Sequence, residues 1–275
     1  MSRVALPVTV RRQPAARDQR DHISFSSISL FQSCSLRYFF RYIQRLPEPT
    51  VPASLVVGTG LHVGIEHHFR ELLVGNPPPS LDTLLDVFWS AWHERDGQVI
   101  VFGKGDDINT IGRLAERMFR AFQANSFAQP RGTIVGVEEE LRGQIVPGLP
   151  DLLARVDLMV DEPEAFVVTD FKSARSSWND EHVSDAASQL LLYHELVKPL
   201  ADGKPVRLRF AVLNKNKMPN LVMHDVPVDR HQIERTKLIV ERVWRSIQAE
   251  PFFPSPSPLN CHSCPYRQPC RTWKG

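Results

Sequence analysis

Residues 152–172 read LLARVDLMVDEPEAFVVTDFK, and this stretch predicts two β-strands joined by a tight turn. The segments Leu152–Val160 and Ala165–Lys172 are short and rich in Val, Leu and Phe, and an acidic, proline-containing turn separates them. Each strand carries a carboxylate among apolar residues, Asp157 in the first and Asp170 in the second. Because a carboxylate on a buried strand needs a partner, we expect both to belong to one site.

Asp170 and Lys172 lie two residues apart on the second strand. Side chains alternate along a strand, so these two project from the same face and share the edge of one pocket. Asp157 need not lie directly opposite Asp170 in the hairpin, but both can face one cleft. Such a group suits phosphodiester hydrolysis: carboxylates hold Mg²⁺ or Mn²⁺, the metal activates water, and the lysine orients the water or neutralises charge. The structural alternative is a buried Asp157 paired with Arg155 or another basic residue.

An Asp-x-Lys triplet is weak evidence alone, because short patterns recur by chance. Asp202-Gly203-Lys204 has the same pattern but lies in a predicted turn. The environment of Asp170, at the end of an apolar strand, distinguishes the two.

Outward from the hairpin, the chain divides into a mainly helical front and a back in which strands and helices alternate, which predicts an α/β fold. The Arg-rich residues 1–22 are expected to form a flexible basic arm, and residues 23–275 a single domain. That domain comprises a helical part at 23–129, a sheet core at 130–250 and a tail at 251–275. The expected helices cover 24–47, 60–73, 81–94, 110–124, 180–200 and 229–249, and the expected strands cover 133–144, 152–160, 165–172, 206–214 and 221–228.

Gln189 and Tyr193 lie four residues apart on the helix expected after the hairpin. Residues at this spacing share one helix face, which can pack over the sheet and reach the edge carrying Asp170. The order of the elements carries more information than either residue does alone.

Asp157, Asp170-Phe171-Lys172 and Gln189-Leu190-Leu191-Leu192-Tyr193 together resemble the three C-terminal motifs of RecB-like PD-(D/E)XK nucleases, and Gly58-Thr59-Gly60-Leu61-His62 resembles the upstream Gly-x-x-x-His signature of that family. The resemblance implies a restriction-endonuclease-like αβββαβ core with a helical N-terminal region and a cysteine-rich C-terminal tail. It implies catalytic roles for His62, Asp157, Asp170, Lys172, Gln189 and Tyr193. It also implies a Mg²⁺ or Mn²⁺ site at His62, Asp157, Asp170 and Phe171.

The four cysteines stand one near the front, Cys34, and three near the end, Cys261, Cys264 and Cys270. In a chain expected inside the cell, they indicate metal ligation rather than a disulfide framework. Four thiolates could serve an iron-sulfur cluster or structural zinc. Iron-sulfur members of the nuclease group, including AddB and the CRISPR-associated RecB-like exonucleases, divide their ligands in this one-plus-three manner. The resemblance therefore implies a 4Fe-4S cluster, with structural zinc and unligated cysteines as alternatives.

Bulk properties set the remaining expectations. The formal charge of +2 does not announce a polyanion partner, and no apolar run is long enough to cross a membrane, so we expect a cytoplasmic protein without a membrane partner. The Walker-type phosphate loop is missing, so any helicase or recombination partner is a separate protein. The resemblance implies a DNA exonuclease that acts on single-stranded ends in recombination, repair or DNA processing. The alternatives are a catalytically silent DNA-binding protein and an end-independent endonuclease of the same fold.

Overall fold

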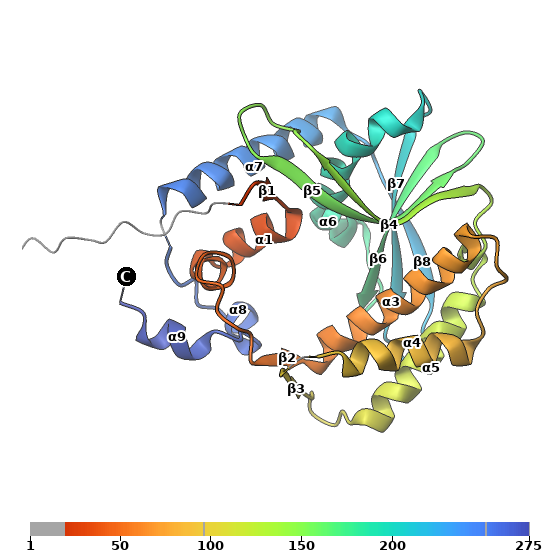
Figure 1. Cartoon of the computed structure of the whole chain (residues 1–275), viewed down its shortest axis with the longest axis horizontal. Helices are drawn as coiled ribbons and strands as arrows, with labels where there is room; N and C mark the ends of the chain where they lie inside the picture. The colour runs from red at the N-terminus through yellow and green to blue at the C-terminus, as the bar shows by residue number, and fades with distance from the viewer. Residues whose placement is uncertain (1–19, 96, 251, 275) are drawn as a thin grey trace, which may run out of the picture.

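The computed structural model describes residues 20–95, 97–250 and 252–274. At its centre lies a six-stranded mixed sheet with helices on both faces, which confirms the predicted α/β class (Figure 1). The sheet runs in the order β1-β5-β6-β7-β8, and β4 also pairs with β5. Its strands are β1 (His22–Ile23), β4 (Thr133–Gly143), β5 (Asp151–Asp161), β6 (Phe166–Ala174), β7 (Val206–Asn214) and β8 (Leu221–Val226).

The strands β4, β5 and β6 form an antiparallel meander, as their short connections predict. Helix α6 (Asp180–Val197) then crosses over to β7, which runs parallel to β6, and β8 returns antiparallel to β7. The expected αβββαβ order is therefore present, with β8 added at the far edge.

The strands β5 and β6 pair over only part of their length. Their register runs from Asp161 opposite Phe166 to Leu158 opposite Thr169, and there the pairing ends. Beyond this point β6 continues beside β7 as far as Ala174. Strands β5 and β6 separate at this point, which we call the fork. Asp157 directly precedes the last paired residue of β5, so its side chain lies at the fork.

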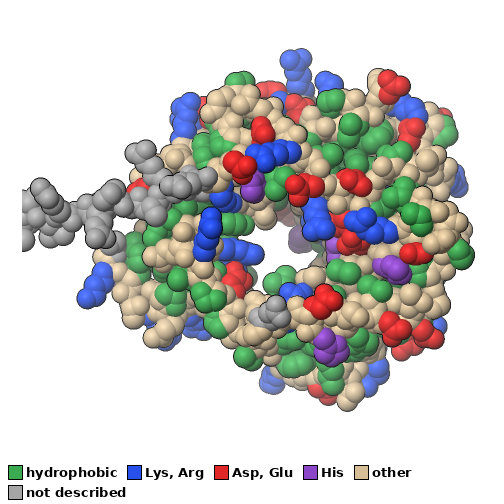
Figure 2. All heavy atoms as spheres, in the orientation of Figure 1, with side chains coloured by type: hydrophobic (Ala, Val, Ile, Leu, Met, Phe, Trp, Pro, Cys, Tyr) green, Lys and Arg blue, Asp and Glu red, His purple; other side chains and the backbone are tan. Residues whose placement is uncertain are grey.

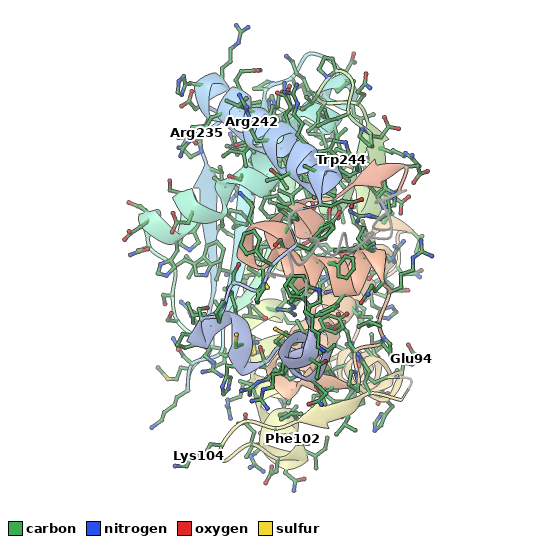
Figure 3. All side chains as sticks on the ribbon, turned by 90° about the vertical axis from the view of Figure 1, so that its left-hand side faces the viewer. Glu94, Phe102, Lys104, Arg235, Arg242 and Trp244 are labelled. Carbon is green, nitrogen blue, oxygen red and sulfur yellow. The ribbon has the colours of Figure 1, made fainter. Side chains whose placement is uncertain are left out.

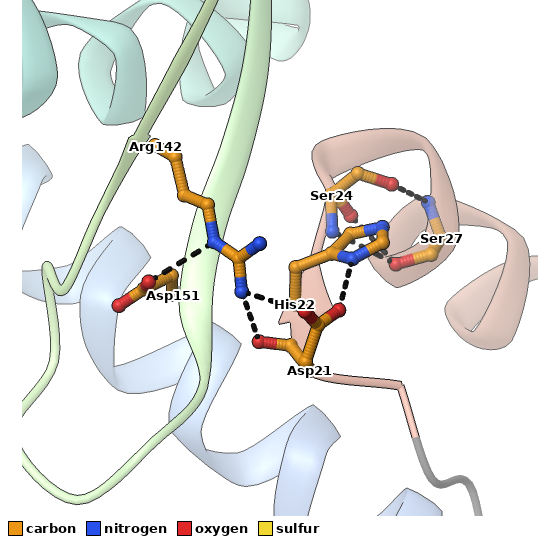
Figure 4. A network of polar contacts seen from close by, with 6 residues as sticks. All are labelled: Asp21, His22, Ser24, Ser27, Arg142 and Asp151. Atoms are coloured by element: carbon orange, nitrogen blue, oxygen red, sulfur yellow. Dashed lines mark hydrogen bonds and ion pairs between the residues drawn. The ribbon is translucent and has the colours of Figure 1, made fainter.

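The start of β5 is bound by the beginning of the described chain. β1 pairs in parallel with Asp151 and Leu152. The Arg142 side chain lies 3.0 Å from a carboxylate oxygen of Asp21 and 3.1 Å from one of Asp151, and so fastens this segment to the sheet (Figure 4). Most of the expected flexible arm, residues 1–19, lies outside the described residues; Asp21 and His22, at its end, belong to the folded sheet edge.

Helices α3 (Ala53–Leu73), α4 (Leu81–His93) and α5 (Ile108–Gln123) cover one face of the sheet, and α6 covers the other with α7 (Arg230–Ala249) behind it (Figure 1). Helix α3 begins at Ala53, seven residues before the predicted start at Gly60. Gly60 lies inside the helix and does not begin it, and both Gly60 and Gly64 are contact positions: a Cβ on Gly60 would lie 2.6 Å from the Phe88 ring, and one on Gly64 would lie 2.4 Å from Phe119. Small residues let α3 pack closely against its two neighbours.

The helix predicted over 24–47 with Cys34 inside it is wrong. Cys34 has extended backbone, with φ −163°, between α1 (Phe25–Ser33) and α2 (Ser35–Tyr38), and a π-helix, η1 (Phe39–Ile43), follows. The break is stabilised from the other end of the chain. The backbone N–H of Leu36 donates to the carbonyl of Phe253, and the Ser35 hydroxyl exchanges hydrogen bonds with the Phe253 backbone.

The tail contributes two short helices, α8 (Pro258–His262) and α9 (Arg267–Thr272), after the extended run that its prolines predict. The smaller elements are the parallel pair β2 (Thr50–Pro52) and β3 (Val99–Val101), and the 3₁₀ turns η2 (Ser126–Ala128) and η3 (Lys198–Ala201). Of the helices that the structure describes, none combines the length and apolarity that a membrane span requires.

Candidate active site

His62 of α3 lies between two carboxylates from adjacent strands. Its Nε2 is 2.9 Å from Oδ2 of Asp157 on β5, and its Nδ1 is 3.0 Å from Oε1 of Glu138 on β4. The ring also packs edge-on against Phe171, 5.7 Å between centroids, which fixes its orientation. The predicted pair of His62 and Asp157 is therefore brought together, and Glu138 joins it.

Glu138 was not among the residues that the sequence singled out. It is the first of three consecutive glutamates, a pattern that gives no sign of which one turns inward. Val137 pairs with Leu158 and Glu139 with Val156, so Glu138 lies across the ladder from Asp157. Its φ of 54° is in the left-handed region, which non-glycine residues rarely occupy outside functional or strained positions.

Asp157 also completes the backbone hydrogen bonding at the fork. Its Oδ2 accepts a 2.6 Å hydrogen bond from the backbone N–H of Phe171, on the side of β6 that β5 has left. The Phe171 side chain is buried and stacks on Phe69, so it offers nothing to a metal. Because the N–H and C=O of one strand residue point to the same edge, the Phe171 carbonyl is the group directed to the fork.

Asp170 and Lys172 share the other face of β6, as the alternation of side chains predicts, with 2.6 Å between Oδ2 and Nζ. Lys172 donates a 2.9 Å hydrogen bond to Oε1 of Gln189, and Gln189 in turn donates one of 2.9 Å to the Tyr193 hydroxyl. The two α6 residues thus fix the position of the lysine side chain from the helix that covers this face of the sheet. The alternative partner proposed for Asp157, Arg155, instead lies 2.7 Å from Oε2 of Glu138.

Burial shifts the protonation of these groups. Burial raises the pKa of Asp170 to about 7: the Lys172 charge opposes the shift and the Asp157 charge adds to it. Burial alone would lower the pKa of His62, but its hydrogen bonds to Asp157 and Glu138 outweigh that effect and raise it to about 10. Burial likewise raises the pKa of Tyr193, so its hydroxyl stays protonated at neutral pH.

The chemistry of these residues fits a divalent cation. One ligand atom from each of His62, Glu138 and Asp157 lies within 4.8 Å of the others. The side chains of Glu138, Asp157 and Asp170 are only 5%, 10% and 3% exposed, so three carboxylates share one buried site. The basic side chains beside them are His62, Arg155 and Lys172. Oε1 of Glu138 and Oδ2 of Asp170 are buried and lie 3.0 Å from His62 and 2.6 Å from Lys172, but neither contact has the alignment of a full hydrogen bond. Hard oxygen atoms of this kind are the ligands that Mg²⁺ and Mn²⁺ prefer.

A cavity of about 460 Å³ opens on this group, and its lining includes His62, Glu138, Arg155 and Lys172. We call it the active-site cavity. Its volume lies within the range of small-ligand sites, so a nucleotide-sized group can approach the acidic cluster.

The four cysteines lie in one neighbourhood at the joint between the two ends of the chain. Cys34, Cys264 and Cys270 pack against the buried side chains of Leu36, Phe40 and Tyr266. Burial raises the pKa of the Cys270 thiol, and the charges of the other three cysteines add to the effect. All four are half-buried, which suits a metal centre shielded from water on one side.

The comparisons with known proteins agree with this geometry. The sequence pattern of the PD-(D/E)XK nuclease superfamily matches residues 22–271. A crystal structure from Eubacterium rectale, provisionally described as an exonuclease, superposes with a TM-score of 0.60 at 14% identity, over 98% of this chain and 95% of that one. At that identity the likeness shows the fold. The protein SSO0001 superposes with a TM-score of 0.36 at 15% identity, over 83% and 89% of the two chains, too weakly to argue from.

No protein with a curated description matches the chain. The family pattern nevertheless spans nearly all of it, including the meander, the fork and the helices on both sides. The chain belongs to the PD-(D/E)XK nuclease superfamily.

Proposed function

We propose that the protein is a Mg²⁺- or Mn²⁺-dependent DNA exonuclease that hydrolyses phosphodiester bonds at single-stranded ends. The observation that carries the proposal is the convergence at the fork. Side chains from α3, β4, β5, β6 and α6 meet there although they are far apart in the sequence. The superfamily supplies the reaction class.

The residues at the fork divide the work. When bound, the cation would supply a Lewis acid that activates water and stabilises charge at phosphorus. His62, Glu138, Asp157, Asp170 and the Phe171 carbonyl would hold it. Lys172 offers a cation that orients the attacking water or neutralises the phosphate. Gln189 keeps the ammonium directed at the cavity, and the protonated Tyr193 supports Gln189.

The preference for free single-stranded ends rests on the resemblance of the motifs to RecB-like nucleases. A catalytically silent DNA-binding protein would not need to keep the buried acids and the lysine together. An end-independent endonuclease of the same fold would keep them, so the two enzymes differ in their substrates. We place the protein in recombination, repair or DNA processing inside the cell, with any helicase or recombination protein as a separate partner.

Digestion of end-labelled DNA tests the proposal. We expect the protein with Mg²⁺ or Mn²⁺ to degrade linear single strands and to leave closed circular single strands intact. Substrates blocked at the 5′ or the 3′ end then give the polarity. Cutting of the circle would favour the endonuclease, and no cutting of any substrate with either metal would leave the silent DNA-binding protein.

Lys172→Ala is the matched test of mechanism. We expect a loss of at least about 10²-fold in the cleavage rate with unchanged folding, the scale seen when one charge-stabilising group is removed. Lys204→Ala is the control, because Lys204 stands in the chance Asp-x-Lys match and pairs with Asp161 away from the site. Cleavage by Lys172→Ala at the wild-type rate would remove this lysine from the mechanism.

We also propose that Cys34, Cys261, Cys264 and Cys270 ligate a 4Fe-4S cluster, with structural zinc as the alternative that the same thiolates would serve. Their grouping beside one small apolar cluster, with every cysteine half-buried, supports either centre.

A further inference from the structure

A second cavity, of about 440 Å³, adjoins the active-site cavity. The two share Gly58, Thr59 and Ser173 in their linings, so they form one continuous groove. The second cavity runs from the fork toward the cysteine tail, where Ser263 and Pro265 form part of its wall. Figure 2 shows the molecule hollowed at its centre, with Lys and Arg side chains interspersed with Asp and Glu around the hollow. We call this second cavity the outer groove.

Three cations from three separate elements line the outer groove: Arg37 of α2, Arg175 after β6 and Lys215 after β7. None of them forms an ion pair with a carboxylate among the described residues. The Nε of Arg37 is buried and lacks a described acceptor. Burial lowers the pKa of Lys215, and the positive charge of Arg175 adds to that effect. Three like charges in one groove, none of them paired with a described carboxylate, indicate that an anion belongs between them.

The neutral part of the lining favours the same ligand. The N-terminal turn of α3, including Pro52, Ser54 and Leu55, borders the outer groove. Pro52 gives this 21-residue helix no side-chain cap, so its first N–H groups keep their positive partial charge. One carboxylate, Glu48, also lines the groove, but it is already engaged by Tyr266 at 3.0 Å and Arg41 at 3.5 Å.

We propose that the outer groove binds the phosphate backbone of single-stranded DNA, through Arg37, Arg175 and Lys215, next to the nucleotide held at the fork. This binding site rests on the proposed nuclease function. It would hold the nucleotides of the substrate that lie beyond the reach of the motif residues. A single strand fits better than a duplex, because a cavity of about 440 Å³ has the size of a small-ligand site. The groove would bind the phosphate backbone without recognising the base sequence, since no Asn or Gln side chain that could hydrogen-bond to bases is among its described lining residues.

Salt-dependent binding tests the proposal without relying on cleavage. Fluorescence anisotropy of a labelled oligothymidylate is measured with the full-length protein in EDTA over a series of salt concentrations. The dependence of log K on log salt has a slope of about −0.7 per neutralised phosphate for single strands, so the variant Arg37→Ala/Arg175→Ala/Lys215→Ala should show a slope shallower by about 2. Arg175→Ala alone changes an exposed side chain and leaves the fold undisturbed; its slope should be shallower by about 0.7.

Arg235→Ala/Arg242→Ala is the matched control. These arginines are exposed on α7, well away from α8 and α9 (Figure 3). Neither forms an ion pair with another described residue. The control should bind with the wild-type slope.

The possible results separate the binding site, the choice of ligand and the nuclease function. A wild-type slope in both Arg175→Ala and the triple variant would overturn the outer groove, as would an equal change in the α7 control. Tighter binding of duplex than of single strand would overturn the choice of ligand. If the groove variants show the shallower slope but wild-type protein with Mg²⁺ or Mn²⁺ cleaves nothing, the nuclease function fails and the binding site stands.

Discussion

Glu138 has a φ of 54°, and the β4–β5 ladder shifts register just before it, between Ile134 and Gly136. Together these irregularities turn the Glu138 carboxylate toward His62 and leave Glu139 and Glu140 exposed. Strand bulges often redirect a side chain beside an active site in this way. The contacts of Glu138 with His62 and Arg155 offset part of the cost of this backbone conformation, and the proposed cation would add a third partner.

Glu138→Gln should therefore weaken Mn²⁺ binding at least roughly tenfold, the smaller of the losses typical of disturbed metal sites. It should also lower the pKa of His62 from about 10, since one of the two carboxylates that raise it is neutralised. Calorimetry gives the affinity and NMR titration of the His62 ring gives the pKa. Glu139→Gln, next along the strand and exposed, is the control. Equal Mn²⁺ affinity in the two variants would show that Glu138 is no ligand.

The shifted protonation of the site predicts how stability follows pH. The pKa of Asp170 is about 7 against an ordinary 3.8, and that of His62 is about 10 against 6.5. In both cases the folded, metal-free protein holds a proton that the unfolded chain releases at lower pH. The free energy of unfolding should therefore fall as pH rises, between about 4 and 7 through Asp170 and between about 6.5 and 10 through His62.

Bound metal should reverse this pH dependence of the free energy of unfolding. Its ligands must lose those protons to bind it, so its affinity, and the stability it adds, rise with pH. Urea unfolding across this range, with EDTA and with Mn²⁺, measures both trends. Asp170→Asn should flatten the lower part of the metal-free curve and leave the upper part. A metal-free protein whose stability rises steadily with pH would contradict the assignment of these protons.

At the scale of elements, the sheet was predictable because each strand is a short apolar run bounded by turn residues. The predicted edges of β5, β6, β7 and β8 differ from the observed ones by two residues at most. The helical front was harder. Gly58 and Gly60 resemble a helix boundary locally, and only the packing of Phe88 and Ser173 shows why glycine stands inside α3. The break at Cys34 depends on Phe253, more than two hundred residues away, which no local pattern contains.

Helix α3 carries His62, so its close packing on α5 has a measurable consequence. In Gly64→Ala the new Cβ would lie 2.4 Å from the buried Phe119 ring. Overpacking costs about 1–3 kcal/mol, and the better helix propensity of alanine returns at most about 1 kcal/mol, so we expect a net destabilisation of about 1–2 kcal/mol. Denaturant unfolding measures it. Gly112→Ala, whose nearest contact would be 3.1 Å, should cost less. Greater stability of Gly64→Ala than of Gly112→Ala would contradict the packing argument.

At the scale of the whole molecule, the segment around α2 meets the tail, and together they close one side of the outer groove (Figure 1). The backbone of Phe253 bonds to Ser35 and Leu36, and the Asn260 side chain donates to the carbonyls of Ser33 and Ser255. The sequence predicted that Cys34 and the tail cysteines would share a centre, and the proximity of their thiols supports it. The hydrogen bonds that accompany them left no sequence signal, because they involve backbone groups and small polar side chains.

The cysteines and the hydrogen bonds should make separable contributions to holding the tail against the segment around α2. Freshly purified protein should be brown, with a broad absorption band at about 400 nm, if the centre is iron-sulfur, and colourless but zinc-containing if it is structural zinc. Cys270→Ser should remove the metal in either case. Since the clusters that bury β6 contain no tail residue, amide hydrogen exchange should speed up in residues 252–272 and stay slow in β6. Ser35→Ala, which breaks two hydrogen bonds to Phe253 without touching a thiol, should keep the metal and show a smaller loss of protection. Equal protection of the tail with and without metal would mean that the hydrogen bonds alone close the molecule, and the cysteines would then need another explanation.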